Sequence, residues 1–162
     1  MKLYVLIIFR LSDRLEKKIE AMDKKIERIA YDPFGNTVRQ YEKILEISDA
    51  RTRLINLKVM YDLLIRELSG EETLLIARHA LGLSSGEIAE SLGMNGSTVY
   101  KRLCKAIRHA EKVLEKAGFD EKRMERDYGD LPQVTAAKNV VKRRVKRAAV
   151  RPRRCAEQKP VA

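Results

Sequence analysis

Polar and basic side chains recur on one side of a predicted helix that begins after Asn95. Ser97, Lys101 and Lys105 repeat every four positions, so they share one helical face. Hydroxyl groups donate and accept hydrogen bonds, and ammonium groups donate them to acceptors such as phosphate oxygens and guanine edges. The opposite, apolar face carries Val99, Leu103 and Ile107. The pattern predicts a helix that packs on a core with one side and offers the other to nucleic acid.

A second, shorter helix is predicted directly before it, over residues 85–92. Ser84 and Glu87 have the spacing of a capping box, in which each side chain bonds a backbone N–H of the first turn. Ala89 provides a small residue where a following helix can cross, and Gly93 tolerates the positive φ of a tight turn. Val99 lies six residues after that turn and supplies the apolar contact. Together these positions predict a helix-turn-helix.

The same residues resemble the promoter-reading region 4 of bacterial sigma factors. The matching positions are Gly82, Leu83, Ser84, Glu87, Ile88, Ala89, Leu92, Gly93, Ser97, Thr98, Val99, Arg102 and Leu103. The resemblance implies a domain that binds double-stranded DNA and contacts RNA polymerase. We therefore expect residues 69–118 to form the DNA-binding domain.

We assign the DNA contacts by position within this predicted unit. Ser97, Tyr100 and Lys101 are expected to read base edges, whereas Arg102, Lys105 and Arg108 are expected to contact phosphates. Alternatively, Tyr100 pads a helix interface, Arg102 pairs with Glu87 or Glu90, and Arg108 lies beyond the groove. The remaining predicted contacts are Ser84, Ser85, Asn95, Gly96 and Thr98.

The residues before this domain predict a helical arm over residues 1–68. A heptad-like apolar seam predicts a helix over residues 11–30, and residues 31–37, with Pro33 and Gly35, predict a loop. A long helix over residues 38–68 follows, with one stripe formed by Tyr41, Leu45, Leu54, Leu57, Tyr61, Leu64 and Leu68. The partner of that stripe is either the first helix, folded back, or another subunit. The expected fold class is therefore all-α, with a coiled-coil-like arm.

The apolar run over residues 3–9 superficially resembles a signal peptide. It is too short to span a bilayer, lacks a small-residue cleavage site and meets Arg10 directly. We interpret it as a short strand or an apolar helix start, and expect a cytoplasmic protein without a membrane anchor.

The positive charge is concentrated at the C-terminal end. The chain of 162 residues has a net charge of +11, and residues 131–162 contain ten Lys/Arg against one Glu, which gives +9 and leaves +2 for the rest. We predict a charged, mostly basic tail over residues 119–162, partly helical or disordered, that strengthens DNA binding without regard to sequence. Pro132 is the expected point at which the tail divides from the folded protein.

Catalysis and metal binding are not expected. The carboxylates are distributed along helix faces as partners of Lys and Arg, and no nucleophile has a base at a recognisable spacing. Two cysteines and two histidines show no metal-ligand spacing, so we expect neither a metal nor another cofactor. Cys104 and Cys155 are expected to be free thiols.

The sequence therefore predicts a DNA-binding transcription regulator that assists RNA polymerase. Its overall layout resembles the ArpU- and RinA-like late-gene regulators of phages and integrated elements. The sequence also allows two alternatives: a small terminase subunit, which recognises DNA for phage packaging, and a module that binds RNA polymerase but not DNA. A homo-oligomer formed through the arm is the alternative to a folded-back hairpin, and a ring of eight or more subunits would favour the terminase, whereas a monomer or dimer would favour the regulator.

Overall fold

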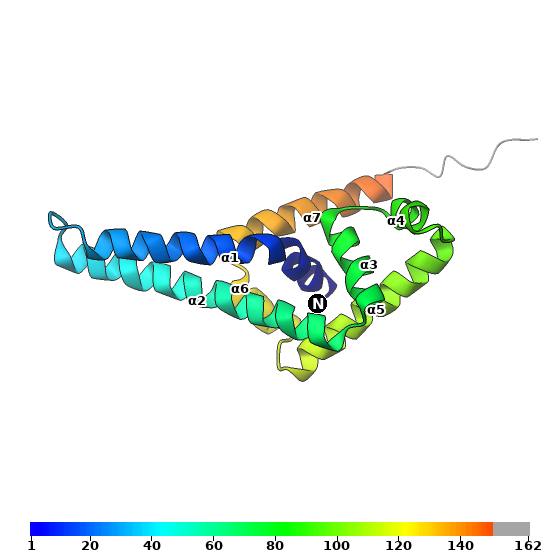
Figure 1. The fold of residues 1–162 in the computed structure, drawn as a ribbon, viewed down its shortest axis with the longest axis horizontal. Coiled ribbons are helices and arrows are strands. Elements are labelled where there is room, and N and C mark those ends of the chain that lie inside the picture. Colours follow the sequence, from blue (N-terminus) through cyan, green and yellow to red (C-terminus); the bar gives the residue numbers. More distant parts are fainter. Residues whose placement is uncertain (151–162) are drawn as a thin grey trace, which may run out of the picture.

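The computed structural model describes residues 1–150, with side chains through Arg143, and every regular element in that part of the chain is a helix. The helices are α1 (Lys2–Ala30), α2 (Thr37–Glu67), α3 (Gly70–Leu81), α4 (Ser85–Leu92), α5 (Gly96–Lys116), α6 (Glu121–Tyr128) and α7 (Pro132–Val150). Figure 1 shows a long hairpin of α1 and α2 that projects from a group formed by the other helices. The all-α fold expected from the sequence is confirmed.

In the hairpin, α1 covers the apolar side of α2. α1 and α2 pack side by side in opposite directions, so the first helix is the partner of the second (Figure 1). Asn36 caps α2 by accepting a hydrogen bond from the backbone of Arg39 at 3.1 Å, which ends the loop. Ion pairs cross the hairpin between Asp23 and Arg51 and between Glu16 and Lys58.

The single stripe predicted along α2 is wrong in its first half. Leu54 and Leu64 are fully buried, whereas Tyr41 is 67% exposed and Leu45 is 64% exposed. Leu45 and Leu54 differ by nine positions, or two and a half turns at about 3.6 residues per turn, so they lie on opposite faces. The half-buried Ile44 occupies the inner face in this region instead. The free end of α2 therefore carries apolar residues on two faces.

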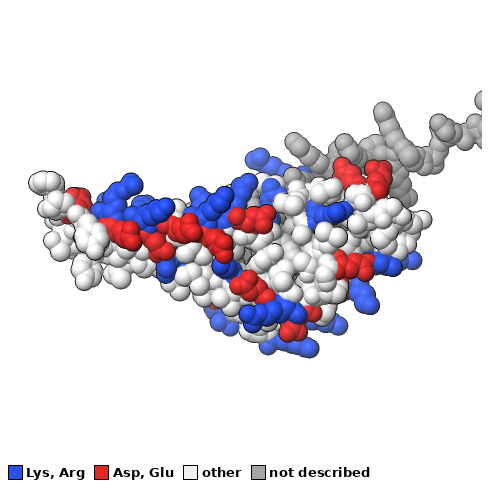
Figure 2. Space-filling model, viewed as in Figure 1, with Lys and Arg blue, Asp and Glu red and all other residues white. Residues whose placement is uncertain are grey.

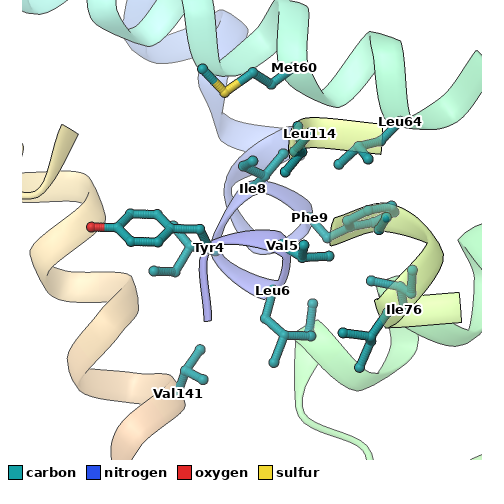
Figure 3. Packing of buried hydrophobic residues seen from close by; sticks show 14 of the residues in the cluster. Tyr4, Val5, Leu6, Ile8, Phe9, Met60, Leu64, Ile76, Leu114 and Val141 are labelled. Atoms are coloured by element: carbon teal, nitrogen blue, oxygen red, sulfur yellow. The ribbon is translucent and has the colours of Figure 1, made fainter. Parts of the chain in front are cut away.

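The apolar run near the N-terminus is the centre of the hydrophobic core. α1 begins at Lys2 rather than at residue 11, and residues 4–9 are all buried in succession. A helix that is apolar on every side is stable only when other elements surround it. Here α2, α3, α5 and α7 all contact α1, and Figure 3 shows side chains from these helices around Val5, Leu6 and Ile8. Of the two expectations for this run, the helix start is confirmed.

Contacts between aromatic and aliphatic side chains fix the orientation of this central segment. The rings of Phe9 and Tyr61 meet edge to face, with centroids 5.4 Å apart and an interplanar angle of 79°. Ile7 and Ile8 expose no surface. Burying one such side chain stabilises a fold by about 1.5–3 kcal/mol. The six buried residues of the run therefore contribute a large share of the stability of the core.

Much of the predicted tail belongs to the same core. Gly118 ends α5 with φ of 82°, and the N–H of Phe119 bonds the carbonyl of Leu114 at 2.9 Å, as in a Schellman motif. α6 then follows, and the buried residues of this C-terminal part are Met124, Tyr128, Leu131, Val134, Ala137, Lys138 and Val141. The chain therefore does not divide at Pro132. Residues 151–162, with the last of the predicted basic tail, lie outside the described part.

A charged cluster joins α7 to the first turn of α1. The ammonium group of Lys138 donates hydrogen bonds to both oxygens of the Glu125 carboxylate, at 2.7 and 2.8 Å, and the Tyr4 hydroxyl donates to the same carboxylate. Lys138 also lies 5.1 Å from the centre of the Tyr4 ring. Burial and the hydrogen bond to Glu125 raise the pKa of Tyr4, while the hydrogen bonds from Lys138 and Tyr4 lower the pKa of Glu125. The cluster gives the ammonium group of the buried Lys138 an opposite charge and two hydrogen-bond acceptors, which offset the cost of burying it.

No helix within residues 1–150 combines the length and the apolar character that a membrane crossing needs.

Candidate nucleic-acid interface

The three helices α3, α4 and α5 are delimited by their own side chains. The Ser84 backbone N–H donates to the Glu87 carboxylate at 2.7 Å, and the Glu87 N–H donates to the Ser84 hydroxyl at 3.2 Å. Ser69 and Glu72 form a second capping box at the start of α3. Because each cap satisfies backbone donors that the helix leaves unpaired, the starts of α3 and α4 are fixed locally.

Two left-handed glycines make the turns between these helices. Gly82 ends α3 with φ of 109°, and Gly93 ends α4 with φ of 61°. Asn95 then caps α5 by accepting hydrogen bonds from the N–H and the hydroxyl of Ser97, at 2.9 and 2.8 Å. Side chains other than glycine adopt such φ values rarely, so these two positions set the angles between the helices.

The crossing of α4 and α5 is formed by the residues that the sequence indicates. Ala89 is 4% exposed and Val99 is fully buried. α5 continues this inner face with Leu103, Ala106, Ile107, Ala110, Val113 and Leu114, all of them buried. One side of α5 is thus anchored over its whole length, which leaves the other side rigid and accessible.

The accessible side of α5 carries the polar and basic residues. Ser97, Lys101, Lys105 and Arg108 are all exposed and recur at intervals of three or four positions. Tyr100 is 59% exposed, so it does not pad a helix interface. A rigid helix with this face can enter a major groove and donate hydrogen bonds to base edges and phosphates.

None of the residues predicted to contact DNA is buried. The exposed ones are Ser84, Asn95, Ser97, Tyr100, Lys101, Arg102, Lys105 and Arg108, and the half-buried ones are Ser85, Gly96 and Thr98. They come from the start of α4, the turn after it and the first turns of α5. Their individual roles in contacting DNA stay predictions.

Arg102 lies to one side of this face and has an acidic partner. Its guanidinium group pairs with the Glu71 carboxylate of α3, not with Glu87 or Glu90 as the alternative prediction had it. The neighbouring Glu72 bonds the His109 ring at 3.1 Å. Although partial burial opposes it, hydrogen bonds from the Ser69 backbone and from His109 hold the pKa of Glu72 below its usual value. Two carboxylates of α3 thus lie along one edge of the basic face.

Lys112 is a member of the basic face that the sequence reasoning missed. It is exposed and follows Lys101, Lys105 and Arg108 at the same helical spacing. The signal was present in the sequence, because intervals of four, three and four positions keep one side of a helix. The face therefore extends further along α5 than the predicted contacts do.

Comparison with known protein families matches residues 59–109 to sigma-70, region 4. The matched residues run from the last turns of α2 through most of α5, so they contain both glycine turns and the exposed face. The chain carries a sigma-70 region 4-like helix-turn-helix. The region 4 domain is a DNA-binding fold, and the chain is accordingly a DNA-binding helix-turn-helix regulator.

The region 4 match covers about a third of the chain and includes the end of α2, which the sequence assigned to the arm. No curated protein and no solved structure matches the chain as a whole or in part. The matched residues leave out α1, α6, α7 and most of α2.

Proposed function

We propose that the chain binds one class of promoter-proximal sites in double-stranded DNA and assists RNA polymerase there, in the manner of a phage or mobile-element regulator. The observation that carries the proposal is the exposed face of α5, where Ser97, Lys101, Lys105 and Arg108 project from a helix anchored along its other side. In this arrangement Ser97 and Lys101 lie near the start of the helix and read base edges. Lys105 and Arg108 contact phosphates.

An accessory role is supported by what surrounds the region 4 domain. Within residues 1–150, the helices outside the match form the hairpin and the C-terminal pair, and they complete the core of this domain. We infer that the chain acts beside a polymerase that melts the promoter by other means. The cytoplasm, where DNA and polymerase meet, is the expected compartment.

The test begins with selection of bound fragments from the parent genome. One recurrent upstream site is expected for a regulator. Lys101→Ala should then lower affinity for that site more than for random duplex, by about 1–3 kcal/mol if Lys101 reads a guanine edge. Equal losses on both duplexes would make Lys101 a phosphate contact, and the measurement is a titration of labelled duplexes by fluorescence anisotropy.

Lys25→Ala is the matched control, because it removes one exposed positive charge from α1. This variant should bind both the selected site and random duplex with nearly the affinity of the wild type. A ring of eight or more subunits in light scattering would instead favour a packaging subunit. Binding to RNA polymerase without any binding to DNA would favour a pure interaction module, and either result would overturn the proposal.

A further inference from the structure

The free end of the hairpin exposes more large apolar side chains than any other part of residues 1–143. Phe34 is 96% exposed and Tyr31 is 84% exposed, and the exposed Val38, Tyr41 and Leu45 follow on α2. Figure 2 shows this end of the molecule largely white, whereas basic and acidic residues alternate along the rest of the hairpin. We call these five residues the tip patch.

The α2 members of the tip patch lie on one helical face, turned away from α1. Val38, Tyr41 and Leu45 are separated by three and four positions, the spacing of a coiled-coil seam. The other face at this level carries the half-buried Ile44 and Ile47. Ile47 lies one heptad before the buried Leu54 and lines a groove together with Met22 of α1. α2 therefore has a second seam that nothing in the described chain covers.

The area of the tip patch is enough for a stable contact between two copies. At roughly 200 Å² per aromatic side chain, Tyr31, Phe34 and Tyr41 expose on the order of 500 Å². Two copies would together bury about 1,000 Å², and Val38 and Leu45 add to that, which reaches the size of a specific interface. Monomeric proteins rarely leave a patch of this size on their surface.

The charges beside the seam favour a second copy of the chain as the partner. A groove runs along α2 next to Leu45, and its lining includes Arg39, Glu42, Lys43 and Glu46. These four residues have no net charge, with two basic and two acidic side chains. Such a surface is self-complementary when it meets itself in the opposite direction, as in a two-fold dimer.

We propose that two copies of the chain associate through their tip patches, with the two α2 helices antiparallel and the two-fold axis between Tyr41 and Glu42. In this register Val38 lies opposite the partner's Leu45, because the two positions are equally distant from the axis. The partner's Glu46 lies two residues, or about 3 Å along the helix axis, from the position opposite Arg39, and the pair occurs twice by symmetry. The region 4 domains are then at the two far ends of the dimer.

The proposal is tested by charge exchange in the full chain, with molar mass measured by sedimentation over a range of concentrations. Arg39→Glu and Glu46→Arg each place like charges close to one another twice, so each variant alone should associate about tenfold more weakly or worse. An equimolar mixture of the two variants should associate as the wild-type chain does. Weakening in the single variants requires the antiparallel register. A parallel pair would set residue 39 opposite residue 39 and residue 46 opposite residue 46, so like charges would already face one another in the wild type and neither variant alone would associate more weakly.

Apolar variants provide the second arm of the test. Tyr41→Asp combined with Leu45→Asp should give a monomer with unchanged helicity, because both side chains already face solvent. Val59→Ser is the matched control: Val59 is 59% exposed on α2, but outside the tip patch, and its replacement should leave the dimer intact. A wild-type chain that stays monomeric at hundreds of micromolar would overturn the proposal. So would a dimer that survives the double aspartate variant, or a monomer whose tip patch binds RNA polymerase instead.

Discussion

The region 4 unit and the first turns of α1 are both buried in one core, but their sequences reveal this to different degrees. In α3, α4 and α5, every helix start has a capping side chain within three residues of it, and both turns have a glycine at positive φ. The first turns of α1 have no side-chain cap, and residues 4–9 find their partners in α2, α3, α5 and α7. Local hydrogen bonds define the first region, and distant packing defines the second.

The two regions also differ in what they contribute. The region 4 unit positions the face that meets DNA, while the start of α1 fills the space behind it, with Leu75 and Ile76 of α3 buried in the same core. Because α1 contacts both α3 and α5, the unit that reads DNA shares its core with the N-terminal helix.

The largest effect is expected from a cavity at the start of α1. Ile8→Ala removes a fully buried side chain and should lower the free energy of unfolding by about 2–5 kcal/mol. Urea denaturation followed by circular dichroism measures the loss. Ile26→Ala is the control in the same helix, since Ile26 is only half-buried on the hairpin seam, and its effect should be clearly smaller.

The same experiment decides whether the two regions unfold together. A fluorescent label on α5 should report the same urea midpoint as circular dichroism, in the wild type and in the Ile8→Ala variant. If the α5 label kept its midpoint while the remaining signal shifted, the region 4 unit would be an independent domain.

A smaller loss of stability is expected at the start of α4, where the capping box joins residues only three positions apart. Ser84→Ala removes the side-chain acceptor of the Glu87 N–H and should cost about 1 kcal/mol of stability. Ser84→Asp keeps an acceptor at this position and should retain most of the stability. Equal losses in both variants would show that stability depends on the hydrogen bond that the Ser84 hydroxyl donates to the Glu87 carboxylate, because an aspartate side chain cannot donate it.

These differences explain which parts could be predicted from the sequence. Ser84, Gly93 and Asn95 act within a few residues, so the helix-turn-helix and its exposed face were readable from their spacing. The spacing of nine residues between Leu45 and Leu54 also places them on opposite faces of α2, but it does not indicate which of the two faces α1 covers. The core role of the run over residues 3–9 required partners that lie far away in the sequence, and a hydrophobic run alone does not name them.

The pairing of Arg102 shows the same limit within the site itself. The sequence offered Glu87 and Glu90 as neighbours in the adjacent helix, but the observed partner, Glu71, comes from the helix before it. Only the angle between α3 and α5 determines this choice.

The smallest effect is a dependence of stability on pH at the turn between α3 and α4. The His79 ring hydrogen bonds the Leu83 carbonyl at 3.1 Å, and burial lowers the pKa of His79 below its usual 6.5. As the pH falls through 6.5, the unfolded histidine gains a proton more readily than the folded one, so stability should decrease from pH 7.5 to pH 5.5. His79→Gln should flatten this slope in urea midpoints, and an unchanged slope would assign the dependence to other groups.

The central position of residues 4–9 has a consequence for synthesis on the ribosome. Tyr4 bonds Glu125, which is 121 residues later in the chain. At about 5–20 residues per second, the apolar run emerges on the order of ten seconds before its last partners are made. During that interval six consecutive apolar side chains, all buried in the finished fold, have only α2, α3 and α5, as these emerge, to cover them, because α7 is made last. The nascent chain is therefore a natural client for a chaperone at the ribosomal exit, and slowed translation should increase its aggregation.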